Sequence, residues 1–128
     1  LSLIISNLKV MNTLDKGKEG EDMTCAYLKK QGYCIRNRNF YYQKAEIDNI
    51  ATKDDTIAIV EVKWRFSDFY GTPETFVTPK KRKLLARAAD FYLQKFNWEG
   101  ETRFDIISIV GQPPIHSLKH IEHTFYFV

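Results

Sequence analysis

The stretch from Ala45 to Arg65 restricts the fold of this chain more than any other part of it. It contains two runs rich in isoleucine and valine, Glu46–Ala51 and Ile57–Lys63, separated by the polar residues 52–56. Two such runs around a short polar cluster predict a β-hairpin. We therefore expect two adjacent antiparallel strands near the centre of the structure.

Charged residues lie at one end of this predicted hairpin. If the turn is centred on residues 54 and 55, Asp48 lies opposite Glu61, with Cβ atoms about 5 Å apart. A shift of one residue in the register would place Asp48 on the other face of the sheet. Because side chains alternate along a strand, Glu61 and Lys63 project from the same face. The hairpin thus predicts two carboxylates and an ammonium group side by side.

Two interpretations of this charged group are open. In the first, Lys63 neutralises Asp48 and Glu61 in a structural ion cluster. In the second, the two carboxylates bind a divalent cation. Charges placed among residues such as Ile47 and Val62 are costly to bury unless they are paired or bind metal. We favour the metal site by a small margin.

The bulk properties of the chain indicate one globular domain. The 128 residues are enough for a single core, and we expect a domain over residues 12–128 after an N-terminal extension over residues 1–11. No run approaches the roughly 20 apolar residues that span a bilayer, so we expect no membrane partner. Cys25 and Cys34 fall in apolar patterns and lack metal-ligand spacing, which favours buried, reduced thiols in a cytoplasmic protein.

The order of predicted elements defines the fold class. We expect a helix over residues 12–31 that ends at Gly32, a strand over 33–40, the two hairpin strands, a helix that begins at Thr78-Pro79, and a strand over 103–110. A strand–helix–strand connection within one sheet is right-handed, so the last strand should lie parallel to the third. The prediction is an α/β fold of the α+β kind, with a mixed sheet flanked by helices.

Glu21 and Glu46 are two further acidic candidates. Glu21 shares the inward face of the first helix with Cys25 and Leu28, where a carboxylate needs a partner, and from there it can reach the acidic end of the hairpin. A glutamate favoured by the helix dipole in the first turn explains it equally well. Glu46 shares the face of Asp48 and could be a ligand, but we expect it to form a surface ion pair.

Basic residues indicate an anionic partner. The net charge of +3 is small, so the distribution of charge matters more than its size. Lysine and arginine gather in the first turn of the second helix, where the helix dipole disfavours them. Nucleic acid is the commonest anionic partner. The residues expected to contact it are Lys80, Lys81, Arg82, Lys83, Arg65 and Arg38.

Three histidines and one charged pair complete the candidates. His116 and His120 have the i, i+4 spacing that suits a metal if the segment is helical. The residues that follow are more typical of a strand, so we interpret both, and His123, as surface or packing residues. Arg103 and Asp105 alternate on one strand face and are expected to form a structural pair.

The acidic and basic residues together resemble a known set. A helix Glu, then Ile-Asp on one strand and Glu-x-Lys on the next, resembles the PD-(D/E)xK nuclease superfamily, which includes restriction endonucleases and archaeal Holliday junction resolvases. The fuller pattern is similar to the YraN-like family of small bacterial proteins. The matching motifs, within residues 17–110, are Gly20-Glu21, Arg38-Asn39, Glu46-Ile47-Asp48, Val60-Glu61-Val62-Lys63 with Arg65, Gly71, Pro73, Lys80 and Arg103-Phe104-Asp105.

Two positions depart from the family pattern. Ala45 stands where the signature has glycine, which changes the backbone options beside Asp48. Asn49 stands where an apolar residue is usual. Neither departure removes a candidate metal ligand.

The resemblance implies a restriction endonuclease-like core and a metal-dependent endonuclease that acts on nucleic acid, chiefly DNA and including branched DNA. It implies that Asp48 and Glu61, with the Val62 carbonyl, hold Mg²⁺ or Mn²⁺. Glu21 would bind the metal directly, bind it through water, or complete the site of a second ion. Lys63 would orient the attacking water or stabilise the transition state. Likeness to junction resolvases also implies a homodimer.

Two other functions stay open at this point. The protein could bind nucleic acid without cleaving it, with the acidic cluster vestigial, and metal affinity distinguishes that function from a nuclease. Alternatively, it could be an interaction protein without nucleic acid, which predicts no salt-dependent affinity for DNA.

Overall fold

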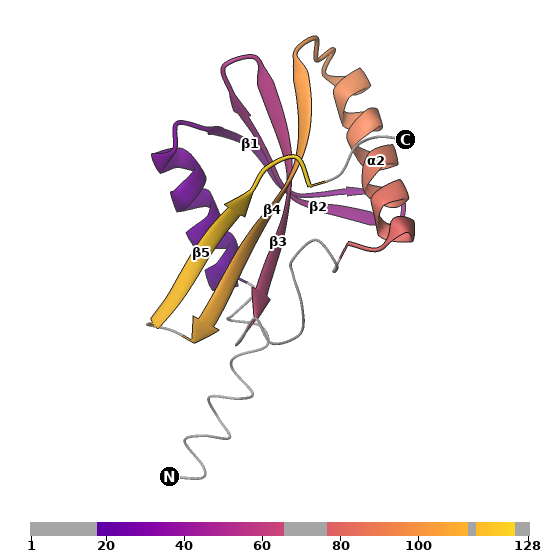
Figure 1. The fold of residues 1–128 in the computed structure, drawn as a ribbon. Helices are drawn as coiled ribbons and strands as arrows, with labels where there is room; N and C mark the ends of the chain where they lie inside the picture. Colours follow the sequence, from indigo (N-terminus) through magenta and orange to yellow (C-terminus); the bar gives the residue numbers. More distant parts are fainter. Residues whose placement is uncertain (1–17, 66–76, 113–114, 125–128) are drawn as a thin grey trace.

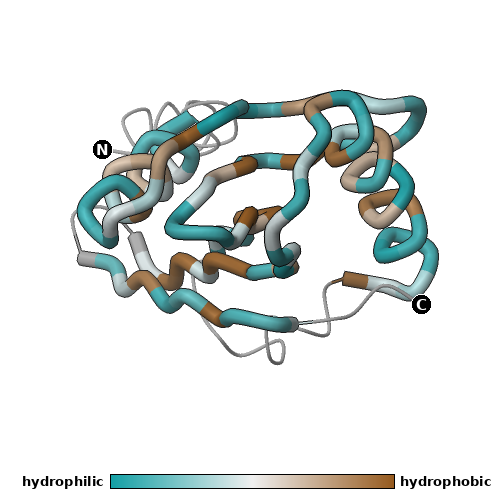
Figure 2. The backbone as a smooth tube through the Cα atoms, turned by 90° about the horizontal axis from the view of Figure 1, so that it is seen from above, coloured by the Kyte–Doolittle hydropathy of each residue, from teal (hydrophilic) through white to brown (hydrophobic). Residues whose placement is uncertain are grey.

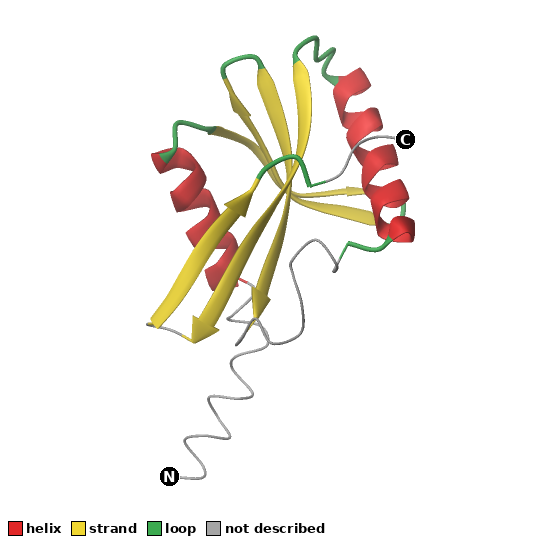
Figure 3. Cartoon of the chain, viewed as in Figure 1, coloured by secondary structure: helices red, strands yellow, loops and turns green. Residues whose placement is uncertain are grey.

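A mixed sheet of five strands, in the order β1-β2-β3-β4-β5, forms the centre of the protein (Figures 1 and 3). The computed structural model describes residues 18–65, 77–112 and 115–124. The first helix is described over residues 18–30. The other elements are β1 (Cys34–Tyr42), β2 (Ala45–Lys53), β3 (Thr56–Arg65), α2 (Pro79–Lys95), β4 (Glu101–Gln112) and β5 (Ile115–Ile121).

The strand directions confirm the predicted topology. β1, β2 and β3 are successive antiparallel neighbours, and β4 runs parallel to β3 after the connection through α2. The segment that carries His116 and His120 forms β5, an antiparallel strand that the sequence analysis did not predict. The two histidines therefore stand on a strand and not on the helix that the metal-ligand spacing requires.

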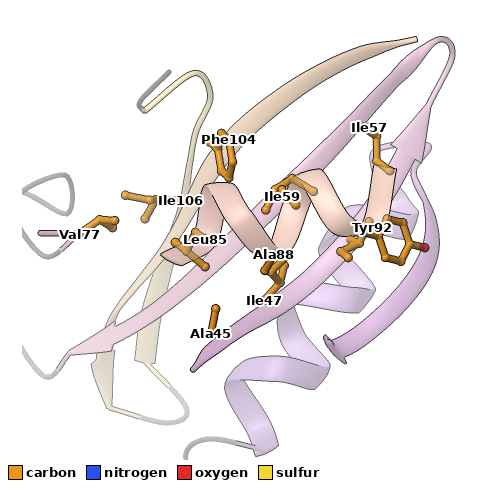
Figure 4. Close-up of a cluster of buried hydrophobic side chains, with 12 residues drawn as sticks. Ala45, Ile47, Ile57, Ile59, Val77, Leu85, Ala88, Tyr92, Phe104 and Ile106 are labelled. Carbon is orange, nitrogen blue, oxygen red and sulfur yellow. The ribbon is translucent and has the colours of Figure 1, made fainter. Parts of the chain in front are cut away.

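The two helices cover opposite faces of the sheet, as the view from above shows (Figure 2). Beneath α2, the side chains of Leu85, Ala88 and Tyr92 pack on isoleucines of β2 and β3 (Figure 4). On the other face, a second cluster joins Leu28 of the first helix to residues of the central strands: Ala51, Ala58, Val60, Ile107 and Ile109. β3 contributes residues to both clusters, so both of its faces are buried. This explains its continuous hydrophobic run.

The predicted signals end the first helix and begin α2. Gly32 has φ +95°, a conformation that glycine adopts without strain, and the Tyr33 amide donates to the Leu28 carbonyl at 2.9 Å. At α2, the Thr78 hydroxyl accepts a hydrogen bond from the Lys81 amide at 3.2 Å, and Pro79 is the first helical residue. Both helix boundaries follow the predicted stop and start signals.

A buried polar cluster joins β4, β5 and the first helix. The Asp105 carboxylate accepts hydrogen bonds from Arg103, at 2.9 and 2.8 Å, and lies 2.7 Å from His120 Nε2. His120 Nδ1 lies 3.0 Å from the Tyr27 hydroxyl, and Arg103 also donates to the Tyr33 hydroxyl. The predicted structural pair of Arg103 and Asp105 is confirmed. His120 is a packing residue of the same cluster.

The prediction of two buried cysteines is confirmed for Cys25 and wrong for Cys34, which is exposed at the first position of β1.

Some predictions lie outside the described residues. These are the extension over residues 1–11, the start of the first helix, and positions 71 and 73 of the family pattern. Among the helices that the structure describes, none combines the length and the apolar character that crossing a membrane requires.

Asp105→Asn tests the cluster as a source of stability. The substitution leaves the half-buried Arg103 without its countercharge, and we expect unfolding at pH 7 to become easier by about 3 kcal/mol. Burial alone would raise the pKa of Asp105, but hydrogen bonds from His120 and Arg103 outweigh it and lower this pKa below 3.8. The contribution is therefore present above about pH 4 and declines as the pH falls further.

Urea unfolding at pH 7, 5 and 3 measures this effect. Glu122→Gln is the matched control, because Glu122 is half-exposed and lies 3.8 Å from Arg103. The control should change stability by less than about 0.5 kcal/mol. Equal stability of Asp105→Asn and the wild type at pH 7 would show that the cluster does not stabilise the fold.

Candidate functional site

The sheet divides where β2 leaves β3. The two strands pair from Lys53 and Thr56 as far as Asn49 and Val60, which confirms the predicted register. Beyond that pair, β2 stays with β1 and β3 stays with β4 (Figure 1). We call this point the fork. Asp48 and Glu61 are the first residues beyond the last pair, so both carboxylates stand at the fork.

Asp48 takes the place of a strand partner for β3. Its Oδ2 atom accepts a hydrogen bond of 2.8 Å from the Val62 amide, a group that the departing β2 backbone no longer meets. Burial, followed by the negative charge of Glu61, raises the pKa of Asp48 to about 7. A carboxylate that is this hard to ionise has few cationic partners of its own.

Glu61 is the more deeply buried carboxylate, with 7% of its side chain exposed. Its Oε1 atom lies 2.6 Å from Lys81 Nζ and 3.8 Å from Lys63 Nζ. Burial and the positive charge of Lys81 lower the pKa of Lys63. Burial alone would also lower the pKa of Lys81, but the hydrogen bond to Glu61 and the charge of Glu61 outweigh it and raise this pKa.

Lys81 belongs to the site, although the sequence analysis assigned it only to nucleic-acid contact. Thr78 fixes the start of α2, and Lys81 then lies one turn before Leu85, on the stripe that continues through Ala88 and Tyr92. Residues four apart share a helix face. Its position four residues before Leu85 is the signal that could have identified Lys81 as an inward-facing lysine.

A cavity of about 220 Å³ opens beside the two carboxylates. Besides Asp48, Glu61 and Lys81, its walls contain charged and apolar side chains of β2, of the turn before β2, and of α2: Lys44, Ala45, Glu46, Leu84 and Leu85. Ala45, which stands at the signature glycine position, is one of these wall residues. Glu46 faces the same space as Asp48, as the strand period predicts.

Glu21 lies apart from this cavity. Its Oε2 atom lies 3.4 Å from Asn39 Nδ2 and 3.7 Å from the Arg38 guanidinium, so the structure places it against β1. Gly20 allows the first helix to approach β3, because a Cβ atom there would meet the Trp64 ring at 3.1 Å. The described side chains that line the cavity do not include Glu21.

The other basic candidates lie around the site and not in it. Lys80 and Lys83 are exposed on the first turn of α2. Arg82 donates to the Val77 carbonyl at 3.0 Å, and Arg38 pairs with Asp22 at 2.9 Å. Arg65 is half-buried at the end of β3.

The carboxylate oxygens at the fork fit a hard divalent cation such as Mg²⁺. Within the described ranges, no three histidine, cysteine or acidic side chains gather closely enough to form a metal cage. Mg²⁺ needs no such cage, because it keeps several waters and binds through one or two carboxylates together with substrate phosphates. The mutual repulsion that raises the pKa of Asp48 is also the repulsion that a divalent cation between the two carboxylates relieves.

The fold and site define a class of protein: a mixed, forked sheet between two helices, with two carboxylates and two lysines at the fork. The sequence profile of the uncharacterised protein family UPF0102 matches residues 20–109. The chain belongs to this family, the YraN-like group that the motifs resemble.

Relatives align over most of their length. A UPF0102 protein of Phocaeicola vulgatus is 42% identical over 110 residues, which cover 86% of this chain and 91% of the relative. One from Flavobacterium psychrophilum is 43% identical over 88% of this chain and 94% of its own. One from Persephonella marina is 45% identical, with 86% and 92% covered.

Asp48→Asn should make the metal-free protein more stable at alkaline pH. The folded state raises the pKa of Asp48 from 3.8 to about 7, so ionising this carboxyl destabilises the fold progressively between these pH values and fully above them. An amide avoids this penalty, which we expect to be on the order of 2 kcal/mol after solvent screening.

Thermal unfolding in EDTA at pH 5 and pH 8 measures the difference. The melting temperature of Asp48→Asn should exceed that of the wild type at pH 8, and the gap should narrow at pH 5. Asp90→Asn, on the exposed side of α2, serves as the control. A variant that is no more stable than the wild type at pH 8 would contradict the raised pKa.

Proposed function

We propose that this protein is a divalent-metal-dependent endonuclease that acts on nucleic acid, with DNA, including branched DNA, as its substrate class. The observation that carries the proposal is the fork, where Asp48 and Glu61 meet beside a cavity with Lys63 and Lys81 next to them. An ion cluster built for stability alone would gain little from an adjoining cavity with polar walls.

Asp48 and Glu61 are the residues that would hold Mg²⁺ or Mn²⁺, which prefer oxygen ligands. The Val62 carbonyl is a third candidate. Amide and carbonyl of one strand residue point to the same side, and the Val62 amide is directed to Asp48. A bound divalent ion supplies the positive charge that polarises a phosphodiester and makes a water more acidic. Glu21 lies against β1 and would act through water.

Lys63 holds a positive charge where negative charge develops during phosphodiester hydrolysis. It shares the β3 face of Glu61, and its Nζ atom is 3.8 Å from that carboxylate, so it is oriented without being fully neutralised. Preorganised charge of this kind stabilises a transition state more than it stabilises the bound substrate. Its ammonium group can also donate a hydrogen bond that orients the attacking water.

The surroundings of the cavity support an anionic polymer as substrate. Lys80 and Lys83 are exposed on the same helical turn that supplies Lys81, and Lys44 lines the opposite wall. Lysines along one surface neutralise successive phosphates and give a salt-dependent affinity. No base-reading contact follows from this arrangement, so we expect recognition by backbone and shape.

A cleavage assay tests the proposal. Labelled four-way junctions, flaps, single strands and linear duplexes are incubated with the protein in Mg²⁺ or Mn²⁺ and resolved on denaturing gels. We expect cleavage of one substrate class, and we expect Glu61→Gln and Lys63→Ala each to reduce its rate at least ~100-fold. Lys30→Ala, which removes an exposed charge on the first helix, should cleave like the wild type.

The same assay separates the nuclease from the other functions. On native gels of the same mixtures, retarded migration of DNA without cleavage in either metal, unchanged by Glu61→Gln, would identify a binding protein with a vestigial acidic site. Neither cleavage nor salt-dependent binding would leave an interaction protein.

A further inference from the structure

Lys81 contacts Glu61 more closely than any other described cation does. The 2.6 Å separation between Nζ and Oε1 is that of a strong, charge-assisted hydrogen bond, whereas Lys63 lies 3.8 Å from the same oxygen. Both lysines contact Oε1, so a divalent ion that coordinates this oxygen has to displace Lys81 or share the oxygen with it. Even at the second oxygen of Glu61, the positive charge of Lys81 opposes a cation.

The position of Lys81 allows it to leave this contact. The residue stands in the first turn of α2, and 36% of its side chain is exposed. Four rotatable bonds let a lysine ammonium move without any change in the helix. Lys63 is exposed to a similar extent, 30%, but it lies farther from Glu61, so Lys81 is the lysine with a close contact to exchange.

The charge balance at the fork favours a coupled exchange. With both carboxylates ionised, Asp48 and Glu61 are balanced by Lys63 and Lys81, so a divalent ion that binds alone leaves two uncompensated positive charges. A phosphodiester supplies one negative charge at the same place and halves this excess. Displacing Lys81 from Glu61 to a phosphate oxygen gives the ammonium group a new partner, while Lys63 stays beside Glu61.

We propose that Lys81 is a counter-ion of Glu61 that blocks metal binding in the free protein and moves to a substrate phosphate when nucleic acid arrives. The inference rests on the proposed nuclease function and adds a regulatory property to it. Metal and nucleic acid bind cooperatively, and the protein holds little metal without substrate. Lys81 is a specificity residue for the phosphodiester backbone in this scheme.

Titration with Mn²⁺ in the absence of nucleic acid tests the blocking contact. Free Mn²⁺ is followed by electron paramagnetic resonance for the wild type, Lys81→Met and Lys83→Met at pH 8. Removing the competitor should tighten Mn²⁺ binding about tenfold in Lys81→Met. Lys83→Met is the matched control, with the same charge change on the same helical turn and an exposed side chain, and it should differ less than about twofold.

A second measurement tests the move to phosphate. DNA affinity is measured in EDTA and in Ca²⁺, a hard cation with oxygen ligands like Mg²⁺. Wild-type affinity should rise on adding Ca²⁺, and this increase should be about tenfold smaller in Lys81→Met, because coupling between two ligands is reciprocal. Lys83→Met should weaken binding by the same factor in both solutions.

Because Mn²⁺ binding is measured without cleavage, these experiments test the inference separately from the proposed nuclease activity. Mn²⁺ affinity that is unchanged or weaker in Lys81→Met overturns the inference, as does an absence of Mn²⁺ binding in both wild type and variant. Melting curves of each variant show whether a change in Mn²⁺ affinity comes from misfolding. Lys81→Gln, which removes the same charge with a polar side chain, should give the same change as Lys81→Met. Tighter Mn²⁺ binding in Lys81→Met supports the counter-ion role whether or not the wild type cleaves the DNA substrates offered.

Discussion

The hydrogen bond from the Val62 amide to the Asp48 carboxylate makes the fork possible. When two paired strands separate, the backbone groups that faced each other lose their partners, and a buried amide without a partner costs about as much as a lost hydrogen bond. Asp48 replaces the missing backbone acceptor with a side-chain oxygen at 2.8 Å. The sheet can therefore open beside Glu61 without leaving the Val62 amide unsatisfied.

The cost of this arrangement is electrostatic. Two carboxylates lie close together at the edge of the core, where water screens them poorly. Lysines from a strand and a helix restore the balance at Glu61, and the site keeps its charge next to an open cavity. Asp105, a buried carboxylate outside this site, has a different environment. Arginine and histidine enclose it on the other face of the sheet and lower its pKa, which is typical of a structural ion cluster.

Local patterns predicted the elements that depend on local chemistry. The hairpin register followed from two polar residues at the turn, and the ends of the helices followed from Gly32 and from Thr78-Pro79. The parallel strand followed from the handedness of crossover connections. β5 was not predicted, because its histidines and lysine obscure the alternation and its pairing with β4 is a tertiary property.

The site was predictable only in part. The strand period gave the shared face of Glu61 and Lys63, and the register placed Asp48 and Glu61 together, just beyond the last pair of β2 and β3. The partner of Glu61 comes from α2, which is 20 residues away along the chain, and no strand pattern reports how a helix packs. Glu21 illustrates the reverse case. Its place on the inward helix face was predictable, whereas its contact with Arg38 and Asn39 depends on how β1 lies against the helix after the register shift between Ile35 and Asn37.

The N-cap of α2 has a consequence for how this protein can vary. Thr78 fixes the rotational phase of the helix, and each residue advances that phase by about 100°. An insertion or deletion between Lys81 and Leu85 would turn Lys81 to a different side while the hydrophobic stripe stayed in place, and one between Thr78 and Lys81 would separate the stripe from its N-cap. The span from Thr78 to Leu85, about two turns, therefore has a fixed length, even though many sequences could form the same helix.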